Sequence, residues 1–339
     1  MSVLPTRQTP CVAYFTIRFD LRNPDFCGVP IAERYAAALD MCEWADQHGF
    51  LMAILSEHHG SPDGYLPSAM PLAAAIAART KSMRVLVGAL VSSFHDPLKL
   101  AEDASVVDAI SGGRFDLVIT NGYVASEFDM FGVPLNKRAA RTTELLETLQ
   151  KAFSGKPFEY RGRTVQVTPP PATAGGPPLQ LGGSSEPAAR RAARLGVGFM
   201  PSGEEIWEHY RAATIEYGRP DPGPYLGGDT SFFHVTEDVE RGWEQIGPYA
   251  MHEANAYGEW MAEAGIGAEG GYTTFKNLDE LKATGQYRVI TPQELIDELK
   301  AAGPFAGALL HPMMGGIPPA IAWESLRLIE NVVMPALAE

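Results

Sequence analysis

The chain has 339 residues, of which 45% are hydrophobic and 20% charged, a composition typical of a globular protein with a large buried core. Its formal net charge of −14 at pH 7 argues against binding to nucleic acid or to an anionic membrane surface, because both need a positively charged face. No apolar stretch approaches the roughly 18 residues that span a bilayer. An anionic ligand would therefore have to be held by a local cluster of donors.

Cysteine usage and the first residues of the chain predict a cytoplasmic protein. Cys11, Cys27 and Cys42 are widely spaced and form no C-x-x-C motif, which is typical of reduced thiols. Residues 1–10 contain a single basic residue, Arg7, and no long apolar run, so they do not match a signal peptide.

Short apolar runs alternate with helical patterns through the first half of the chain. Runs rich in aromatic and β-branched residues predict strands, and apolar residues at helical spacing predict helices. Strands are expected at residues 11–19, 51–55, 84–91 and 115–120, and helices at 31–48, 68–80, 97–110 and 138–153. Asp96 before Pro97 is a favourable helix start, because aspartate caps free N–H groups and proline fits the first turn.

The same alternation continues through the second half. Residues 158–167 alternate as a small hairpin. Strands are then expected at 179–183, 198–200, 230–235 and 305–311, and helices at 186–195, 204–217, 238–263, 291–302 and 318–337. Residues 264–287 are glycine-rich and weakly patterned, and they are too long for a simple connector in a compact domain.

Eight short strands, each followed by a helix and with no internal linker, predict an α/β protein with the (β/α)8 TIM-barrel fold. We expect one domain over residues 1–339. Residues 264–287 are then an insertion between the seventh strand and the following helix, and we interpret them as a mobile lid.

Polar residues follow the second predicted strand at the point where it ends. In a barrel of this kind the functional site lies at the carboxyl ends of the strands. Glu57, His58 and His59 come directly after the strand at 51–55. Adjacent residues leaving a strand point in different directions, so only one of the two imidazoles need face a ligand. His58 and His59 are therefore candidates for acid–base chemistry.

Three more histidines lie at predicted strand ends. His95 follows the third strand, His234 is near the end of the seventh, and His311 ends the eighth. They predict a polar rim around a substrate pocket, shared with Glu57 and His59. An equally good interpretation is that each is a hydrogen-bonded rim residue with no chemical role.

A glycine turn with two hydroxyl groups precedes the helix at 186–195, and it consists of Gly182, Gly183, Ser184 and Ser185. Backbone N–H groups at a helix N-terminus and serine hydroxyls can bind an anion, and glycine lets a phosphate come close. The same residues are also a plain helix start. Arg138 and Arg141 could supply a cation, although a solvated helix face explains them as well.

Asn121 and Gly122 end the fourth predicted strand. A glycine there would let a flat ring system approach the backbone, and the amide could bond its polar edge. Asn-Gly is also a common turn.

Several motifs, taken in order and spacing, resemble the bacterial luciferase-like monooxygenase family, whose members are flavin- or deazaflavin-dependent barrels. The resemblance covers about residues 11–338. The motifs are Ser56-Glu-His-His59 with Gly64-Tyr-Leu-Pro67, His95-Asp-Pro97 with Ala101-Glu-Asp103, Ser111-Gly-Gly-Arg114, Phe131-Gly-Val-Pro134 and Leu181-Gly-Gly-Ser-Ser185.

The resemblance implies roles for individual residues. His58 matches the histidine that lies over the flavin and acts as a base in the light-emitting members. Ser184 and Ser185 match the residues that bind the flavin phosphate, with help from the region of Arg138 and Arg141.

The same resemblance implies a cofactor site along the third and fourth strands. A non-proline cis peptide is expected near Leu90-Val91. Thr120 stands where the light-emitting members have a reactive cysteine and Asn121 where they have an arginine, so light emission is not expected. Leu90, Thr120, Asn121, Gly122, Gly182 and Gly183 complete the expected cofactor-binding residues.

The implied activity is a flavin-dependent monooxygenation. Reduced FMN (FMNH2) from a separate flavin reductase and O2 would oxygenate a small organic substrate, with His58 as the acid–base residue. One alternative is a dehydrogenase or reductase that uses coenzyme F420 on the same barrel. Another is a non-catalytic flavin-binding protein.

A metal-dependent barrel hydrolase is a further alternative because of the histidine-rich mouth. Against it, the first strand has no H-x-H and no carboxylate ends the eighth, so we expect no metal site. Relatives in the family are commonly homodimers, and the alanine-rich helix at 68–80 offers a flat surface for one.

Overall fold

The computed structural model describes residues 13–227, 232–266, 272–303 and 306–338. Nine of its strands form one parallel sheet in the order β10-β9-β11-β1-β2-β3-β4-β7-β8. The strands are β1 (Tyr14–Phe19), β2 (Met52–Leu55), β3 (Arg84–Val91), β4 (Phe115–Thr120), β7 (Leu179–Gly183), β8 (Gly198–Pro201), β9 (Phe232–Val235), β10 (Tyr287–Ile290) and β11 (Gly307–Leu310). A separate antiparallel hairpin joins β5 (Phe158–Tyr160) and β6 (Arg163–Val165).

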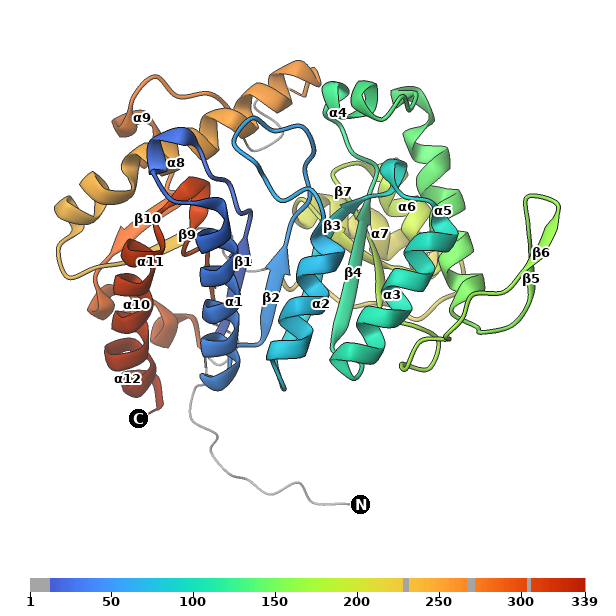
Figure 1. Cartoon of the computed structure of the whole chain (residues 1–339), viewed down its shortest axis with the longest axis horizontal. Coiled ribbons are helices and arrows are strands. Elements are labelled where there is room, and N and C mark those ends of the chain that lie inside the picture. The colour runs from blue at the N-terminus through green and yellow to red at the C-terminus, as the bar shows by residue number, and fades with distance from the viewer. Residues whose placement is uncertain (1–12, 228–231, 267–271, 304–305, 339) are drawn as a thin grey trace, which may run out of the picture.

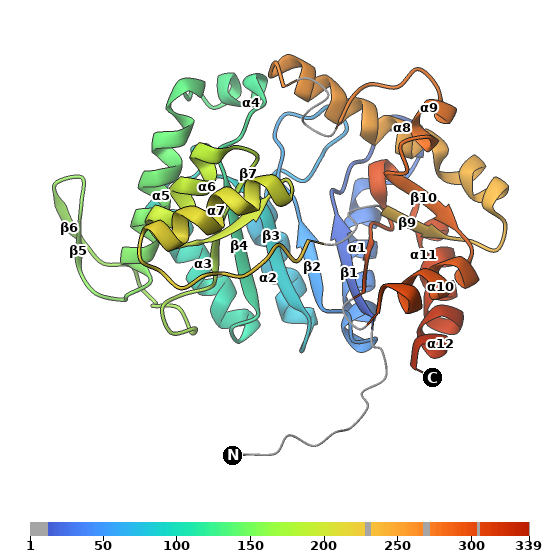
Figure 2. The same ribbon diagram turned by 180° about the vertical axis from the view of Figure 1, so that it is seen from behind.

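Helices cover the outer face of this sheet and cross its carboxyl edge (Figure 1). They are α1 (Ile31–Gln47), α2 (Ala69–Arg79), α3 (Pro97–Ser111), α4 (Ala125–Met130), α5 (Arg138–Ala152), α6 (Glu186–Leu195), α7 (Glu204–Glu216), α8 (Val239–Glu263), α9 (Leu278–Lys282), α10 (Pro292–Ala302), α11 (Pro319–Leu328) and α12 (Met334–Ala338). Figure 2 shows α6 and α7 on the side opposite α1 and α2.

The strands form where the sequence has near-continuous apolar runs, as expected for parallel strands buried on both faces. In β4 all residues from Phe115 to Ile119 are buried, and β1 buries Ile17 and Phe19 completely. Local signals fix the helices. The Asp96 carboxylate accepts hydrogen bonds from two N–H groups at the start of α3, and Thr291 with Glu294 forms a capping box on α10.

The α/β barrel architecture is confirmed, and every predicted strand has a counterpart. Three predicted strands begin on residues outside the described ranges, at 11–12, 230–231 and 305. The elements β10, α4 and α9 were not predicted, because four to six residues are too few to show a period. The predicted helix 318–337 is interrupted by a π turn, Ile329–Val333, between α11 and α12.

The segment predicted as a lid is more ordered than its composition indicated. Its described part contains α9 and ends at the first residue of β10, while residues 267–271 lie outside the described ranges. Before it, the 25-residue α8 runs above the carboxyl ends of the strands (Figure 1). No helix within the described ranges has the length and hydropathy to cross a membrane.

Candidate active site

A cavity of about 260 Å³ lies at the carboxyl ends of β1 to β4, and Tyr257 and Met261 of α8 complete its wall. Residues far apart in the sequence share its wall, because parallel strands end at the same edge of the sheet. They include Arg18 from β1, His58 after β2, Gly122 and Tyr123 after β4, and Tyr257 from α8. The cavity therefore lies where the sequence predicted a site.

His58 lies in the wall of this cavity. Its Nδ1 is 2.8 Å from Oε1 of Glu127, a buried carboxyl on α4, and its ring stacks on Trp260 with 4.2 Å between centroids. In the part of the chain that the structure describes, Nε2 has no hydrogen-bond partner. Burial lowers the pKa of His58 below its usual value near 6.5, and Glu127 offsets this only in part. At neutral pH the ring is therefore uncharged, with Nε2 able to accept a proton.

Glu57 is adjacent to His58 in the sequence, but its carboxylate is hydrogen-bonded to the other two histidines of this region. Its carboxylate accepts from Nε2 of His59 at 2.6 Å and from Nε2 of His95 at 2.9 Å. Burial opposes ionisation of Glu57, but these two hydrogen bonds outweigh it and hold its pKa below the usual range. The backbone N–H of His59 also donates to Glu127 at 2.8 Å. His59 and His95 thus hold Glu57 in place. Glu57 lines the cavity, but His59 and His95 do not.

The predicted cofactor residues of the third and fourth strands surround one side of the cavity. Thr120 and Gly122 line it, and Asn121 has a buried Oδ1 with no hydrogen-bond partner in the described chain. The cis peptide expected near Leu90-Val91 lies instead at Gly88–Ala89, and both of these residues line the cavity. Leu90 points into the hydrophobic core, because successive side chains of a strand alternate.

The glycine turn between β7 and α6 has exposed hydroxyls. Ser184 and Ser185 are exposed, and Ser185 caps α6 without a side-chain hydrogen bond, so its hydroxyl is not committed to the helix. An added Cβ on Gly183 would lie 2.7 Å from Ala188 and one on Gly182 would lie 3.2 Å from Val118, so both glycines are needed for close packing. These four residues lie outside the cavity wall.

The two arginines predicted near this turn lie at the start of α5, which packs against α6. Nη2 of Arg141 donates to the carbonyl of Ser93 at 3.0 Å, and its buried Nε has no partner in the described chain. Arg138 donates to the carbonyl of Leu135 at 3.2 Å. Neither arginine forms an ion pair with a described residue, so both charges are free for an anion.

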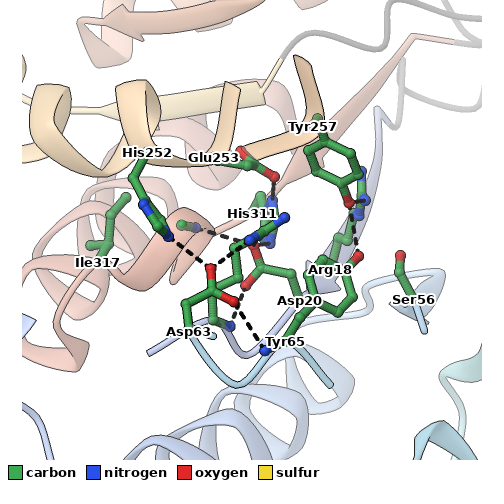
Figure 3. A network of polar contacts seen from close by, with 12 residues as sticks. Arg18, Asp20, Ser56, Asp63, Tyr65, His252, Glu253, Tyr257, His311 and Ile317 are labelled. Carbon is green, nitrogen blue, oxygen red and sulfur yellow. Dashed lines mark hydrogen bonds and ion pairs between the residues drawn. The ribbon is translucent and has the colours of Figure 1, made fainter. Parts of the chain in front are cut away.

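The last two predicted rim histidines do not reach the cavity. His234 is buried in β9, where burial lowers its pKa to about 4. His311 lies between two buried carboxyls, with Nε2 3.6 Å from Asp20 and Nδ1 3.7 Å from Glu253 (Figure 3). Within the described ranges these three residues are the one group close enough to hold a metal ion, their ligand atoms lying within 4.8 Å. This cluster was not predicted from the sequence.

A second buried network ties the loop after β2 to α8. Asp63 binds the guanidinium of Arg22 and accepts from Nε2 of His252 on α8 at 2.7 Å (Figure 3). Burial opposes ionisation of Asp63, but His252 and Arg22 hold its pKa far below the usual range. The guanidinium of Arg22 also lies 4.8 Å from the centroids of the rings of Tyr65 and Trp260. These contacts hold α8 above the cavity.

Glu127, Tyr257, Trp260 and Arg18 were not predicted from the sequence. Glu127 lies on a six-residue helix with no distinct pattern, and the aromatic residues of α8 follow ordinary helical spacing. Arg18 did carry a signal, because a charged residue inside an apolar strand is uncommon.

The family model described as luciferase-like monooxygenase matches residues 18–304. The 4-hydroxyprotoasukamycin monooxygenase of Streptomyces nodosus subsp. asukaensis is 28% identical over 202 residues, 53% of this chain and 54% of that protein. The oxygenase component of the flavin-dependent trigonelline monooxygenase of Acinetobacter baylyi is 29% identical over 148 residues, 43% of this chain and 40% of that protein. The chain thus spans about half the length of these relatives.

Two solved structures share the fold over nearly the whole chain. The monooxygenase RslO1 from Streptomyces bottropensis has a TM-score of 0.72 at 21% identity, over 95% of this chain and 99% of that one. The oxygenating constituent of 3,6-diketocamphane monooxygenase from Pseudomonas putida, solved with FMN, has a TM-score of 0.70 at 20% identity, over 96% and 99%. Because the family model covers most of the sequence, the chain belongs to the luciferase-like monooxygenase family.

Proposed function

We propose that this protein is the oxygenase component of a two-component monooxygenase, which uses reduced FMN (FMNH2) from a separate flavin reductase and O2 to oxygenate a small organic substrate. The observation that carries the proposal is His58, an uncharged imidazole held by buried Glu127 in the wall of a cavity at the barrel mouth. A base in that position can move a proton during an oxygen-transfer reaction.

The residues around the cavity fit a flavin. Asn121, between the cavity-lining residues Thr120 and Gly122, has a buried acceptor oxygen with no partner among the described residues. An added Cβ on Gly122 would lie 2.6 Å from Val91, so the absence of a side chain keeps this wall flat. Ser184 and Ser185, with the uncommitted cations of Arg138 and Arg141, supply donors for a phosphate. When bound, the reduced flavin supplies the electrons that activate O2.

Residues of the chain bind the transferred proton and cover the site. Glu127 fixes the ring of His58 by accepting from Nδ1, so Nε2 is the nitrogen that accepts or returns a proton. Trp260 and Tyr257 of α8 cover the ring from above, with Tyr257 5.9 Å from it. A dry site protects reactive species from discharge by water. We propose residues 264–287 as a lid, since Tyr272 of this segment stacks on Tyr257 in the cavity wall.

Flavin binding and turnover test the proposal separately. Purified protein is titrated with oxidised FMN, and product formation is followed when reduced FMN and O2 are supplied to His58→Ala and the native chain. We expect FMN binding in both proteins and a fall in turnover by about 10²- to 10⁴-fold in His58→Ala. A variant that loses FMN affinity but keeps its turnover at saturating FMN would make His58 a cofactor ligand. FMN binding without substrate-dependent O2 consumption would indicate a flavin-binding protein.

A second candidate is a coenzyme F420-dependent dehydrogenase or reductase. An F420-dependent secondary alcohol dehydrogenase shares the fold with a TM-score of 0.64 at 15% identity, over 96% of this chain. The same phosphate-binding turn could serve either cofactor. Titration with both cofactors discriminates them, and tighter binding of F420 than of FMN would favour this candidate.

A further inference from the structure

Two arginines, both near the end of β1, lie under α8 in different electrostatic surroundings. Arg22 is fully buried, and the fold supplies two carboxylates for it, Asp63 and Asp20. Arg18 lines the cavity and forms no ion pair with any carboxylate in the described ranges. Arginine is always charged. Glu253 is the carboxyl group that acts on Arg18, but the two form no ion pair in the described ranges, and burial raises the pKa of Glu253.

The neighbours of Arg18 are aromatic. Its Nη2 donates to the hydroxyl of Tyr257 at 3.2 Å (Figure 3). Its Cζ lies 5.4 Å from the ring centroid of Phe232. Its Nε is buried with no hydrogen-bond partner in the part of the chain that the structure describes. A buried donor without an acceptor is unfavourable, so a ligand that supplies the acceptor recovers this free energy.

The carboxyl groups of the described cavity wall form no ion pair with Arg18. Burial raises the pKa of Tyr65, Tyr257 and Tyr272, so their hydroxyls stay protonated and can donate. The two carboxyl groups of the wall, Glu57 and Glu127, are hydrogen-bonded to histidines. The free positive charge of Arg18 is therefore available to whatever enters the cavity.

We propose that the cavity takes a small aromatic carboxylate as substrate, with Arg18 binding the carboxylate and the tyrosines packing on the ring. This inference rests on the proposed function and names its substrate class. A guanidinium and a carboxylate match in a two-point hydrogen-bonded geometry, which fixes orientation as well as affinity. Four tyrosines of the described cavity wall, Tyr65, Tyr123, Tyr257 and Tyr272, offer aromatic contacts to a bound ring.

The phosphate of the flavin is the other anion that could lie at Arg18. The topology disfavours it, because β2, β3 and β4 separate β1 from the Ser184-Ser185 turn after β7.

Isosteric pairs of ligands test the proposal on the full-length protein, with and without bound FMN. Calorimetry compares benzoate with benzamide and 2-naphthoate with 2-naphthamide on the native chain, Arg18→Gln and Arg18→Lys. We expect the acids to bind the native chain about 10- to 100-fold more tightly than the amides. Arg18→Gln should remove this preference and Arg18→Lys should keep part of it. Arg163→Gln, on the exposed hairpin strand β6, is the matched control and should bind as the native chain does.

Three results would overturn the proposal. The native chain could bind neither acid, or it could bind acids and amides equally, which would leave Arg18 as a packing residue. Alternatively, Arg18→Gln could weaken FMN but not riboflavin, which would assign the anion to the cofactor phosphate. Circular dichroism and Tm show whether Arg18→Gln is folded, and the acid preference of the native chain does not depend on any variant. FMN titration of the native chain is a separate readout, so a failure of the flavin function is not mistaken for a failure at Arg18.

Discussion

The residues around the imidazole of His58 determine its protonation state and its orientation. Burial disfavours the imidazolium, and the carboxyl of Glu127 selects which nitrogen carries the proton. Trp260 stacks on the ring and keeps it from rotating freely. A histidine at a strand end is common, but a neutral and oriented one is a candidate base.

Glu127→Gln tests the positioning role of this carboxyl group. The amide oxygen of glutamine can still accept a hydrogen bond from Nδ1 of His58. The substitution removes the carboxyl group that raises the pKa of His58. We expect turnover to fall by about 10- to 100-fold, less than loss of the imidazole itself. The acid limb of kcat/KM against pH should move to lower pH. Glu102→Gln, an exposed residue of α3, is the control, and an unmoved acid limb in Glu127→Gln would contradict the role.

The lowered pKa of His234 makes the stability of the protein depend on pH. Its pKa of about 4 in the folded protein lies below the usual 6.5, so the unfolded chain binds the proton more readily between these values. Stability therefore falls as pH drops from about 6.5 to about 4. We expect His234 to account for about 2 kcal/mol of the loss between pH 7 and pH 5.

Urea unfolding of the native chain and His234→Gln at pH 7 and pH 5 measures this contribution. The difference between the two pH values should be smaller in the variant by about that amount. His209→Gln, on the partly exposed face of α7, should behave as the native chain does. An identical difference in all three proteins would show that His234 is not the group responsible.

At the scale of single elements, the turn from β4 to α4 sets the shape of one cavity wall. Gly122 has a φ of 75°, in the left-handed region that favours glycine, and its Cα faces Val91 and Phe128. The turn also orients α4, which carries Glu127. The backbone of one residue thus affects both the wall and the base.

Gly122→Ala should destabilise the protein by about 2 to 4 kcal/mol, because it adds backbone strain and a contact 2.6 Å from Val91. Gly112→Ala is the matched control, since its φ of 64° is similar and nothing lies within 4 Å of an added Cβ. The control should lose only about 1 to 2 kcal/mol. Urea unfolding compares the two, and FMN titration of Gly122→Ala should show weakened binding. Equal losses in both variants would show that the wall can adapt.

Across the whole molecule, the outer face of α2 and α3 is the surface we propose for a homodimer. The buried side of α2 packs on the sheet, and the exposed apolar side chains of Val106 and Ile110 lie on α3, which packs against α2. Exposed apolar residues beside a helix with small side chains are typical of an interface.

Val106→Glu with Ile110→Glu should therefore convert a dimer of 36.6 kDa subunits into monomers, because two charges would be buried unpaired in the interface. Light scattering coupled to size-exclusion chromatography measures the mass. Exposed Val332→Glu, near the C-terminus, is the control and should remain a dimer. A native chain that runs as a monomer would refute the proposed assembly.

Much of the fold was predictable, because strands buried on both faces need continuous apolar runs and helices need a period. The apolar run at 51–55 and the helix start at Asp96 both gave correct elements. Elements of four to six residues, such as α4 and β10, carry too little pattern to be recognised. The same limit hid Glu127, whose helix supplies the partner of His58.

The sequence by itself determined the alternation of strands and helices, the position of His58 at a strand end, and the family, since these depend on local pattern and motif. Only the tertiary structure decided which partner each group has. His58 is paired with Glu127 and not with adjacent Glu57, Leu90 faces the core, and His311 lies between Asp20 and Glu253 away from the cavity. The reason is physical: pKa, orientation and charge balance depend on contacts between residues tens to hundreds of positions apart, which no local spacing encodes.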